Sequence, residues 1–419
     1  MAKFVPQPEL SLNDQMQIRR EKLAALQAEG RDPFVQTKFD FNADSAAIKA
    51  DYEAFEGKTV KVAGRLMSKR GQGKVMFCDL QDRAGRIQIF VKIDELGEEE
   101  YNRFKKYDIG DIVGVEGEVF KTKTEEISIR AKVVTLLSKS LLPLPNKFHG
   151  LTDKEARFRQ RYVDLMVNPE VKRNFIIRSQ FIKHLRDYLD NMGYIEVETP
   201  VLNTIAGGAA ARPFITHHNT LDVDLYLRIA TELYLKRLIV GGFEGVYEIG
   251  KNFRNEGMDK SHNPEFTCME LYVQYKDYKW MMEYTERLLE KICLDVNGTT
   301  EVKVGDNVIS FKAPFKRVTI LGAIKEKTGY DLDGKTEDEI RAICKELGLE
   351  TVDETFGKGK MIDEIFGEFC EGSYIQPTFV TDYPVEMSPL TKKHRDNPAL
   401  TERFELMVNG KELANAYSE

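Results

Sequence analysis

The stretch GVYEIGKNFRNEGMDKSHNPEFTCMELYV, residues 245–273, contains two alternating runs separated by a polar segment. Alternation with a period of two is typical of strands, so it predicts a hairpin whose strands are joined by the loop Asn255–Glu265. One face of the second strand is mostly apolar, whereas the other face carries Phe266, Glu270 and Tyr272. Such a polar face is either exposed to solvent or the floor of a substrate site, and the pattern alone favours neither.

The loop of this hairpin gathers Arg254, Glu256 and His262. Arginine suits bidentate binding of phosphate, and the ring of Phe266 can stack on a base. A lone histidine is more often a surface residue than a catalytic one. Taken together, these residues shift the interpretation of the hairpin toward a nucleotide site.

A second hairpin is predicted at residues 404–419, FELMVNGKELANAYSE, because Asn409–Gly410 is a strong signal for a two-residue turn. Strict pairing places Glu405 opposite Ala414 and puts Glu405 and Glu412 on one face. Two carboxylates held in this way repel each other unless a cation lies between them. Mg²⁺ that bridges ATP phosphates is the expected cation.

The end of this second hairpin carries Asn415, Tyr417 and Glu419, which share a face with one another. In strict register these three residues lie on the other face of the hairpin from Glu405 and Glu412. If both sets serve one site, a bulge near Leu413–Ala414 is required.

Five short alternating segments precede these hairpins, with a helix-like stretch between the third and the fourth, which is the order of an OB barrel. Such barrels bind oligonucleotides on one open face, although some are protein-binding modules. Residues of this region that suit base stacking or phosphate contact are Arg65, Lys69, Arg70, Phe77 and Gln88.

The composition describes a protein with a sizeable core: 419 residues, 42% hydrophobic and 31% charged. No apolar run is long enough to span a membrane, and we expect no membrane partner. Five widely separated cysteines without a CxxC pair indicate free thiols in a reducing compartment, and we expect a cytoplasmic protein. The net charge of −7 means that nucleic-acid contact must rest on local patches.

The length predicts more than one domain. Helices are expected between antiparallel hairpins rather than in βαβ order, and no glycine-rich nucleotide loop of the parallel folds is present. We therefore predict an α+β chain with these parts: an N-terminal helix and lead-in, 1–57; the OB barrel, 58–140; a proline-marked linker, 141–160; and a second domain, 161–419, with a partly helical insert around 320–375.

FRNEG followed by HNPEFTCMELY resembles motif 2 of the class II aminoacyl-tRNA synthetases, and GYIEVETPVL resembles their motif 1. An OB barrel ahead of that catalytic domain resembles the layout of subclass IIb. The stretches LLPLPNKFHGL, GGAAARPFITHHN, LRIATELYLKRL and RFELMVNGKELANAYSE are similar to the lysyl-tRNA synthetase family, and the resemblance runs almost end to end. It implies an antiparallel sheet flanked by helices and a homodimer.

The resemblance also implies an ATP-dependent ligation of L-lysine to tRNA(Lys) through a lysyl-adenylate, with Mg²⁺ as cofactor. Arg254, Glu256 and His262 are then the catalytic residues. The implied ATP site adds four residues to these, Asn263, Phe266, Glu405 and Glu412, and the last two would hold Mg²⁺. The implied lysine site comprises Gly208, Glu232, Arg254, Glu270, Tyr272, Asn415, Tyr417 and Glu419. The implied anticodon site comprises Arg65, Phe77, Gln88 and Glu126.

The carboxylates of the implied pocket, Glu232, Glu270 and Glu419, distinguish between amino acids. One α-amino group cannot neutralise all of them, and buried charges need partners. The remaining negative charge favours a substrate with a distal ammonium group. An aspartyl or asparaginyl pocket would offer a cation or amide donors at that position instead.

Three alternatives follow from the same residues: another subclass IIb synthetase, a paralogue that modifies a translation factor, and a non-catalytic tRNA-binding or regulatory form. The family continues into a third motif with an arginine that binds ATP phosphates, and the 419 residues contain no such segment. Loss of such a donor costs about 3 kcal/mol of transition-state stabilisation. We therefore expect this sequence to be a piece of a longer enzyme and nearly inactive by itself.

Overall fold

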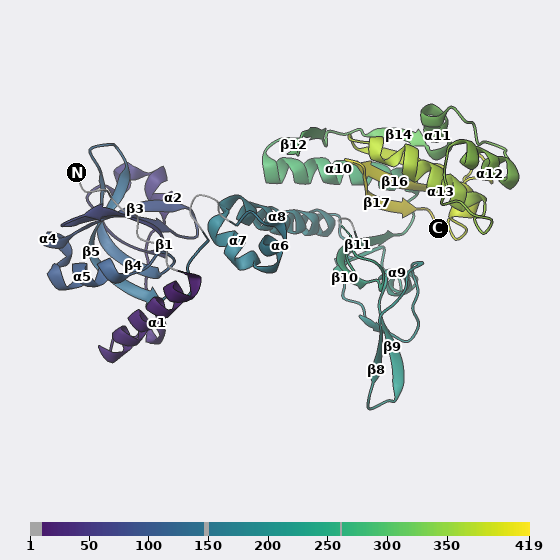
Figure 1. Cartoon of the computed structure of the whole chain (residues 1–419). Helices are drawn as coiled ribbons and strands as arrows, with labels where there is room; N and C mark the ends of the chain where they lie inside the picture. Colours follow the sequence, from purple (N-terminus) through teal and green to yellow (C-terminus); the bar gives the residue numbers. More distant parts are fainter. Residues whose placement is uncertain (1–10, 146–150, 260–261) are drawn as a thin grey trace. The chain divides into compact units, whose positions relative to one another are not determined.

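The computed structural model describes residues 11–145, 151–259 and 262–419, and the chain folds as two compact units, Met1–Lys172 and Arg173–Glu419. The first unit contains a closed five-stranded barrel in the order β1-β2-β3-β5-β4 (Figure 1). Its strands are β1 (Thr59–Gln72), β2 (Val75–Gln81), β3 (Arg86–Lys92), β4 (Ile112–Lys121) and β5 (Ile127–Ser138). This closed barrel, with helices between its third and fourth strands, confirms the predicted OB barrel.

The barrel closes because β1 pairs with β4 through its first half and with β2 through its second half. A register shift between Leu66 and Ser68 bends the strand at this point. Gly64 is needed just before the bend, since an added Cβ would lie 2.4 Å from the carbonyl oxygen of Gln81. Alternate residues of the strands point inward and form one apolar core.

Helices surround the barrel. They are α1 (Leu12–Ala28), the 3-10 turn η1 (Pro33–Val35), α2 (Ser45–Ala50), α3 (Tyr52–Phe55), α4 (Ile93–Leu96), α5 (Glu98–Lys106), α6 (Lys154–Arg159) and α7 (Arg161–Val167). The buried Arg19 of α1 donates to the carbonyl oxygens of Ile109, Ser140 and Leu142. This basic side chain therefore docks its helix on the barrel.

The second unit contains four separate small sheets and the helices around them. Its helices are α8 (Pro169–Asn191), which begins at the unit boundary, α9 (Glu232–Val240), α10 (Tyr278–Asn297), α11 (Ile320–Thr328), α12 (Glu337–Glu346), α13 (Lys358–Phe369) and the turns η2 (Glu371–Ser373) and η3 (Val385–Met387). Its strands are β6 (Ile195–Glu196), β7 (Leu202–Asn203), β8 (Ile215–His218), β9 (Val223–Leu227), β10 (Gly245–Phe253), β11 (Glu265–Val273), β12 (Glu301–Val304), β13 (Asn307–Ser310), β14 (Lys316–Thr319), β15 (Thr378–Thr381), β16 (Arg403–Val408) and β17 (Lys411–Tyr417).

The sheets of the second unit are mixed rather than wholly antiparallel. β6 pairs in parallel with β10, and β14 pairs in parallel with β15. Parallel neighbours need a long crossover, and α11, α12 and α13 supply it between β14 and β15. The expectation that helices lie only between antiparallel hairpins is therefore wrong for this connection.

The helices of this crossover share a core with the strands beside them. Ile324 of α11, Ile340 of α12 and Ile362 of α13 are fully buried in one cluster with Val380 of β15 and Met407 of β16. The predicted insert region is thus packed against the sheet that carries the C-terminal hairpin. Figure 1 shows α13 lying along β16.

The C-terminal hairpin, β16 and β17, turns at Asn409 and Gly410, which both have positive φ (53° and 69°), as the sequence predicts. Its register differs from strict pairing. Val408 lies opposite Lys411 and Met407 opposite Glu412, but Leu406 then lies opposite Ala414, so that Leu413 is the extra residue of a bulge.

Candidate functional site

The polar face of the β10–β11 hairpin is buried. Glu248 lies opposite Glu270, and Asn252 lies opposite Phe266. Only 4% of the surface of Glu248 and 2% of that of Asn252 is exposed. The alternative that this polar row faces solvent therefore does not hold, and the row is available as the floor of a site.

A buried ion pair orders this floor. Arg228 donates from Nη1 to Glu248 Oε1 at 2.5 Å and from Nε to the carbonyl oxygen of Lys251 at 2.8 Å. Thr199 donates from its hydroxyl to the second oxygen of Glu248 at 2.6 Å. Such additional hydrogen bonds are what make a buried ion pair tolerable. Gly250 leaves room for the guanidinium, because an added Cβ would lie 2.3 Å from Nη2 of Arg228.

Arg254 and Phe266 lie together at the end of this floor. The guanidinium carbon of Arg254 is 5.0 Å from the centre of the Phe266 ring. Within the described residues, the buried Nε of Arg254 has no hydrogen-bond partner. Buried polar nitrogens are normally satisfied, and a bound anion would satisfy this one. The arrangement suits a cation and a stacking surface that face one nucleotide.

The other predicted residues of the loop lie in exposed contacts. Glu256 accepts a hydrogen bond at Oε1 from the backbone nitrogen of Arg212 at 3.1 Å. His262 is exposed and has Nδ1 2.7 Å from a carboxylate oxygen of Asp259. Asn263 is also exposed. The structure thus brings these residues near the end of the hairpin without joining their side chains into one cluster.

A cavity of about 1170 Å³ lies beside the C-terminal hairpin. Acidic side chains dominate its lining: Asp363, Glu364, Glu368, Glu371, Glu386, Glu405 and Glu412, with Lys360 and Arg403 as its cations. Burial, reinforced by Glu412 and opposed by Arg403, raises the pKa of Glu405 to about 7. A site that raises the pKa of a carboxyl in this way favours a cation.

Arg403 is held at one wall of this acidic cavity. It forms an ion pair with Glu405 and donates from Nη1 to the hydroxyl of Ser388 at 2.6 Å. Its Nε donates to Oδ1 of Asn415 at 3.2 Å, and the Nδ2 of Asn415 lies 3.4 Å from Glu405. The bulge at Leu413 makes this cluster possible, because it moves Asn415 opposite Glu405.

The donor chemistry of Glu405 and Glu412 fits Mg²⁺, which prefers carboxylate and phosphate oxygens. Both residues line the acidic cavity. In the part of the chain that the structure describes, no group of three or more His, Cys, Asp or Glu side chains is arranged to hold a metal ion. The fit is therefore that of a cation shared between two protein carboxylates and the phosphates of a substrate.

Two glutamates at the opposite end of the floor have both carboxylate oxygens occupied. Glu270 accepts from the backbone nitrogen of Thr231 at 3.0 Å and from the hydroxyl of Tyr272 at 3.1 Å. Glu232 accepts from the hydroxyl of Tyr417 at 3.2 Å and from Lys236 at 2.7 Å. Segments far apart in the sequence are thereby joined into one hydrogen-bonded cluster.

Two details mark the start of α9. Thr231 is the N-cap residue, but its side chain makes no cap hydrogen bond, and its hydroxyl is buried without a partner among the described residues. Gly208 has a φ of +89°, and an added Cβ would lie 3.2 Å from the Cβ of Glu232. The backbone at Gly208 is therefore packed closely against the start of this helix.

Lys236 completes this hydrogen-bonded cluster and is absent from the predicted site. Its ammonium group forms ion pairs with Glu232 and Glu419 and lies 5.9 Å from the centre of the Tyr272 ring. The spacing of four residues between Glu232 and Lys236 on a predicted helix is the signal that could have found half of this arrangement. The contact with Glu419 has no signal in the sequence.

The tyrosines of this pocket stay protonated near neutral pH. Burial, followed by the neighbouring Glu270 and Glu232, raises the pKa of Tyr272 far above its ordinary value. Burial and Glu232 raise the pKa of Tyr417 to about 12. Both hydroxyls therefore remain hydrogen-bond donors to carboxylates.

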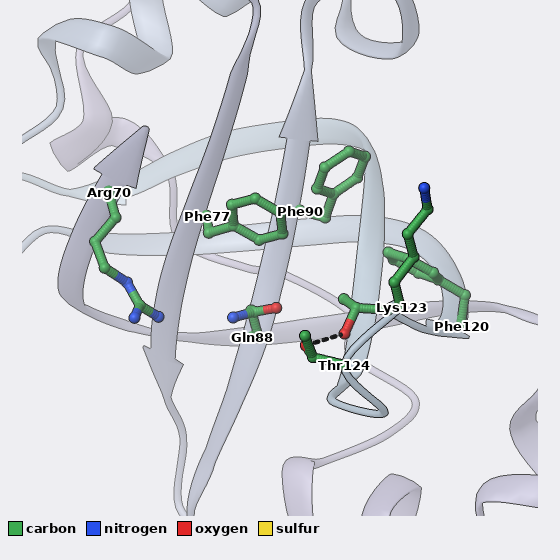
Figure 2. Close-up of a pocket in the computed structure, with 8 residues that line it drawn as sticks. Arg70, Phe77, Gln88, Phe90, Phe120, Lys123 and Thr124 are labelled. Carbon is green, nitrogen blue, oxygen red and sulfur yellow. Dashed lines mark hydrogen bonds between the residues drawn. The ribbon is translucent and has the colours of Figure 1, made fainter. Parts of the chain in front are cut away.

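The barrel of the first unit carries a second cavity of about 570 Å³ (Figure 2). Its lining is Arg70, Phe77, Gln88, Phe90, Phe120, Thr122, Lys123 and Thr124. The rings of Phe77 and Phe90 are 5.1 Å apart, and those of Phe90 and Phe120 are 5.7 Å apart. Aromatic rings next to basic groups form a surface suited to single-stranded bases.

The structure brings Phe77 and Gln88 together in this barrel cavity, whose lining does not include Arg65 or Glu126. Arg65 donates to the carbonyl oxygen of Gly110 at 2.7 Å, and Glu126 lies 3.6 Å from Lys49. Sequence reasoning did not single out Phe90 and Phe120. Alternation along β3 was the available signal for Phe90, because Gln88 and Phe90 share a face.

Lys69, which the sequence suggested as a phosphate contact, has a structural role. Its ammonium group donates to the carbonyl oxygens of Phe104, Lys105 and Tyr107 at the end of α5. Burial lowers the pKa of Lys69.

In the described residues, no helix has the length and apolar character that crossing a membrane requires.

Comparison with known proteins identifies two family matches and many relatives. Residues 153–419 match the family described as tRNA synthetases class II (D, K and N), and residues 60–137 match the OB-fold nucleic acid binding domain. A lysine–tRNA ligase of Porphyromonas gingivalis is 58% identical over 98% of this chain and 74% of its own length. The corresponding protein of Christiangramia forsetii is 57% identical over 97% and 74%, and that of Clostridium perfringens is 55% identical over 99% and 83%.

Proposed function

The chain belongs to the lysine–tRNA ligases of the class II tRNA synthetases, and from this premise we propose how its two units share the ligation of L-lysine to tRNA(Lys). The domain at 161–419 activates lysine with ATP, and the barrel domain at 58–140 binds the anticodon. The two separate cavities support this division, because one is acidic and the other is aromatic and basic.

In the first step, a carboxylate oxygen of lysine attacks the α-phosphorus of ATP, and pyrophosphate leaves with the electron pair of the broken P–O bond. Arg254 stabilises the negative charge that grows on the α-phosphate, and its unpartnered buried Nε supports this role. Phe266 stacks on the adenine, while Glu256, His262 and Asn263 complete the ATP site. In the second step, a ribose hydroxyl at the 3′ end of the tRNA attacks the lysyl carbonyl, and AMP leaves.

We assign Mg²⁺ to Glu405 and Glu412. When bound, the ion would neutralise the charge of the ATP phosphates. The raised pKa of Glu405 and the acidic lining of its cavity support a cation at this position. Arg403 orients Glu405 through their ion pair. Asn415, which accepts a hydrogen bond from Arg403, orients the carboxylate of lysine.

The observation that carries the proposal is the carboxylate set of the pocket. Glu232 and Gly208 hold the α-amino group of lysine, while Glu270, Tyr272 and Glu419 surround its side-chain ammonium. The hydrogen bonds that fix both oxygens of Glu270 support its role as a rigid acceptor. Tyr417, whose hydroxyl donates to Glu232, forms a wall of the proposed lysine site. This charge favours lysine over the acid and amide substrates of the related synthetases.

We assign anticodon binding to the barrel cavity, where Phe77 stacks on a base and Gln88 reads a base edge. Ser128 donates to Oε1 of Gln88 at 3.0 Å, which leaves the amide nitrogen of Gln88 free to donate to a base. Arg65 and Glu126 lie outside that lining, and we propose them as further residues of the anticodon site because the resemblance implies them. The five free cysteines support the predicted cytoplasmic location.

We further propose that the second unit forms a homodimer. Phe175, Ile176 and Phe181 of α8 and Ile195, Val201 and Leu202 near β6 and β7 are large apolar side chains exposed to 38–50%. Exposed apolar groups of this kind mark interaction surfaces when they are contiguous. Light scattering that gives twice the mass of 48.1 kDa is the expected result, and a monomeric mass would contradict it.

Lysine-dependent exchange of pyrophosphate into ATP tests the activity directly. We expect weak exchange with lysine, because the 419 residues contain no segment of the third motif, and none with aspartate or asparagine. Exchange with either of those amino acids in place of lysine would overturn the assignment of the pocket. A chain that binds tRNA but neither binds lysine nor supports exchange would instead match a non-catalytic regulatory form.

A further inference from the structure

Lys236 contacts three residues of the proposed lysine site, Glu232, Glu419 and Tyr272, without being part of the predicted site. It extends from α9, where it is one helical turn from Glu232, and reaches Glu419 beyond the end of β17. About a third of its side chain is exposed, compared with 17% for Glu232. Burial lowers the pKa of Lys236, but its hydrogen bonds to the two glutamates outweigh this, so that its pKa lies above the ordinary value.

The charge of the pocket changes when Lys236 is included. Among the groups assigned to the two ammonium ends of lysine, which exclude Arg254, the carboxylates of Glu232, Glu270 and Glu419 contribute −3 and the ammonium of Lys236 contributes +1, which leaves −2. A free lysine molecule carries two ammonium groups, one on the α-carbon and one on the side chain. The resident cation therefore adjusts the pocket to the two positive charges of one substrate molecule.

We propose that Lys236 is a positioning residue that sets the specificity of the pocket: it ties Glu232 to Glu419 and leaves a net charge that matches the two ammonium groups of lysine. The inference rests on the proposed function of this pocket. Lys236 acts through the carboxylates that it holds, and it does not take part in bond formation. The hydroxyl of Tyr417 donates to the other carboxylate oxygen of Glu232 and so helps to hold this side chain in place.

The consequence is a pocket whose lysine affinity is insensitive to pH near neutrality. The titratable groups that face Lys236 are Glu232 on α9, Tyr272 and Glu270 on β11, Tyr417 on β17 and the following Glu419. Without the cation, Glu232 and Glu419 repel each other, and one of them takes up a proton more readily. The affinity for lysine then falls as the pH falls, since the protonated carboxyl no longer attracts an ammonium group.

Calorimetric titration of the full chain with L-lysine between pH 6 and pH 8 tests the inference. We expect Lys236→Met to weaken binding about tenfold at pH 7.5 and to introduce a steeper loss toward pH 6. Lys236→Arg keeps the charge and should restore the flat pH profile. Lys291→Met is the matched control, because Lys291 forms an exposed ion pair of the same spacing with Asp295 on α10.

A double variant sharpens the test. Removal of Glu419 by Glu419→Gln should cost less affinity in the Lys236→Met background than in the wild type, because the pocket charge then returns to −2. Equal affinity and equal pH profiles for Lys236→Met and Lys291→Met would overturn the inference while leaving lysine binding by the wild type intact. Failure of the wild type to bind lysine would instead overturn the proposed function. If thermal melting shows that Lys236→Met does not fold, the lysine affinities and pH profiles of Lys236→Arg and Lys236→Gln are compared instead. Equal values for these two variants would then overturn the inference.

Discussion

Arg254 has a hydrogen-bonding group that the described residues do not satisfy. Its guanidinium lies over Phe266, and its buried Nε lacks a partner within the described residues. A nitrogen of this kind is costly unless a substrate satisfies it. The same residue stands at the junction between the buried floor and the exposed loop, beside the ring that we propose stacks on adenine.

We expect Arg254→Lys to lower the rate of lysine-dependent exchange by about 100-fold, because a lysine cannot form the bidentate contact of a guanidinium. The melting temperature should be nearly unchanged. Arg287→Lys is the control, since Arg287 is an exposed residue of α10 that pairs with Glu283 at 3.4 Å. A loss of less than threefold for Arg254→Lys would contradict its assigned role.

At the level of elements, the bulge at Leu413 decides which side chains of β17 reach the site. Deletion of Leu413 would shift the pairing by one residue and turn Asn415, Tyr417 and Glu419 to the opposite face. We expect the deletion to abolish lysine binding in calorimetry. Leu413→Ala keeps the register and, because Leu413 is 52% exposed, should change stability by less than about 0.5 kcal/mol. Unchanged binding after the deletion would show that the register does not matter.

A second contact between elements joins the start of α10 to the segment that precedes β16. Arg395 donates to Glu402 at 2.6 Å and to Asp277, the N-cap residue of α10, at 2.7 Å. The hydrogen bond from Arg395 lowers the pKa of Glu402 below its ordinary value of 4.5. The folded protein thus binds fewer protons there than the unfolded chain, so this stabilisation is present above pH 4.5 and is lost as the pH falls through the lowered pKa.

We expect Arg395→Met to reduce the free energy of unfolding at pH 7, since Glu402 is buried and would lose its cation, while Arg395 itself is half exposed. The decrease in stability between pH 5 and pH 3 should become shallower than in the wild type. Urea unfolding across this pH range measures both effects. An unchanged decrease in stability between pH 5 and pH 3 would show that Arg395 does not stabilise the ionised form of Glu402.

At the level of the whole molecule, the two units carry separable parts of the proposed function. We expect Phe77→Ala to raise the KM for tRNA in aminoacylation about tenfold, as loss of one stacked base would, and to leave exchange without tRNA unchanged. Phe34→Ala is a suitable control, because this ring is exposed and lies outside the lining of the barrel cavity. A parallel loss of exchange in Phe77→Ala would indicate that the barrel influences lysine activation.

The sequence by itself determined the local structure of both hairpins and of the barrel. Alternation defined β10 and β11, and the Asn409–Gly410 pair defined the second turn, because strand period and turn geometry depend on neighbouring residues. It also gave the resemblance that the family matches confirm.

Three features depend on long-range packing instead: the register of β17, the parallel pairing of β14 with β15 and the position of Lys236. Lys236 and Glu419 are 183 residues apart, and no local pattern relates them. Their contact depends on how α9 and the C-terminal hairpin pack across the same floor. The charge of the pocket is therefore a property of the fold, because it is the sum over side chains that only folding brings within reach of one another.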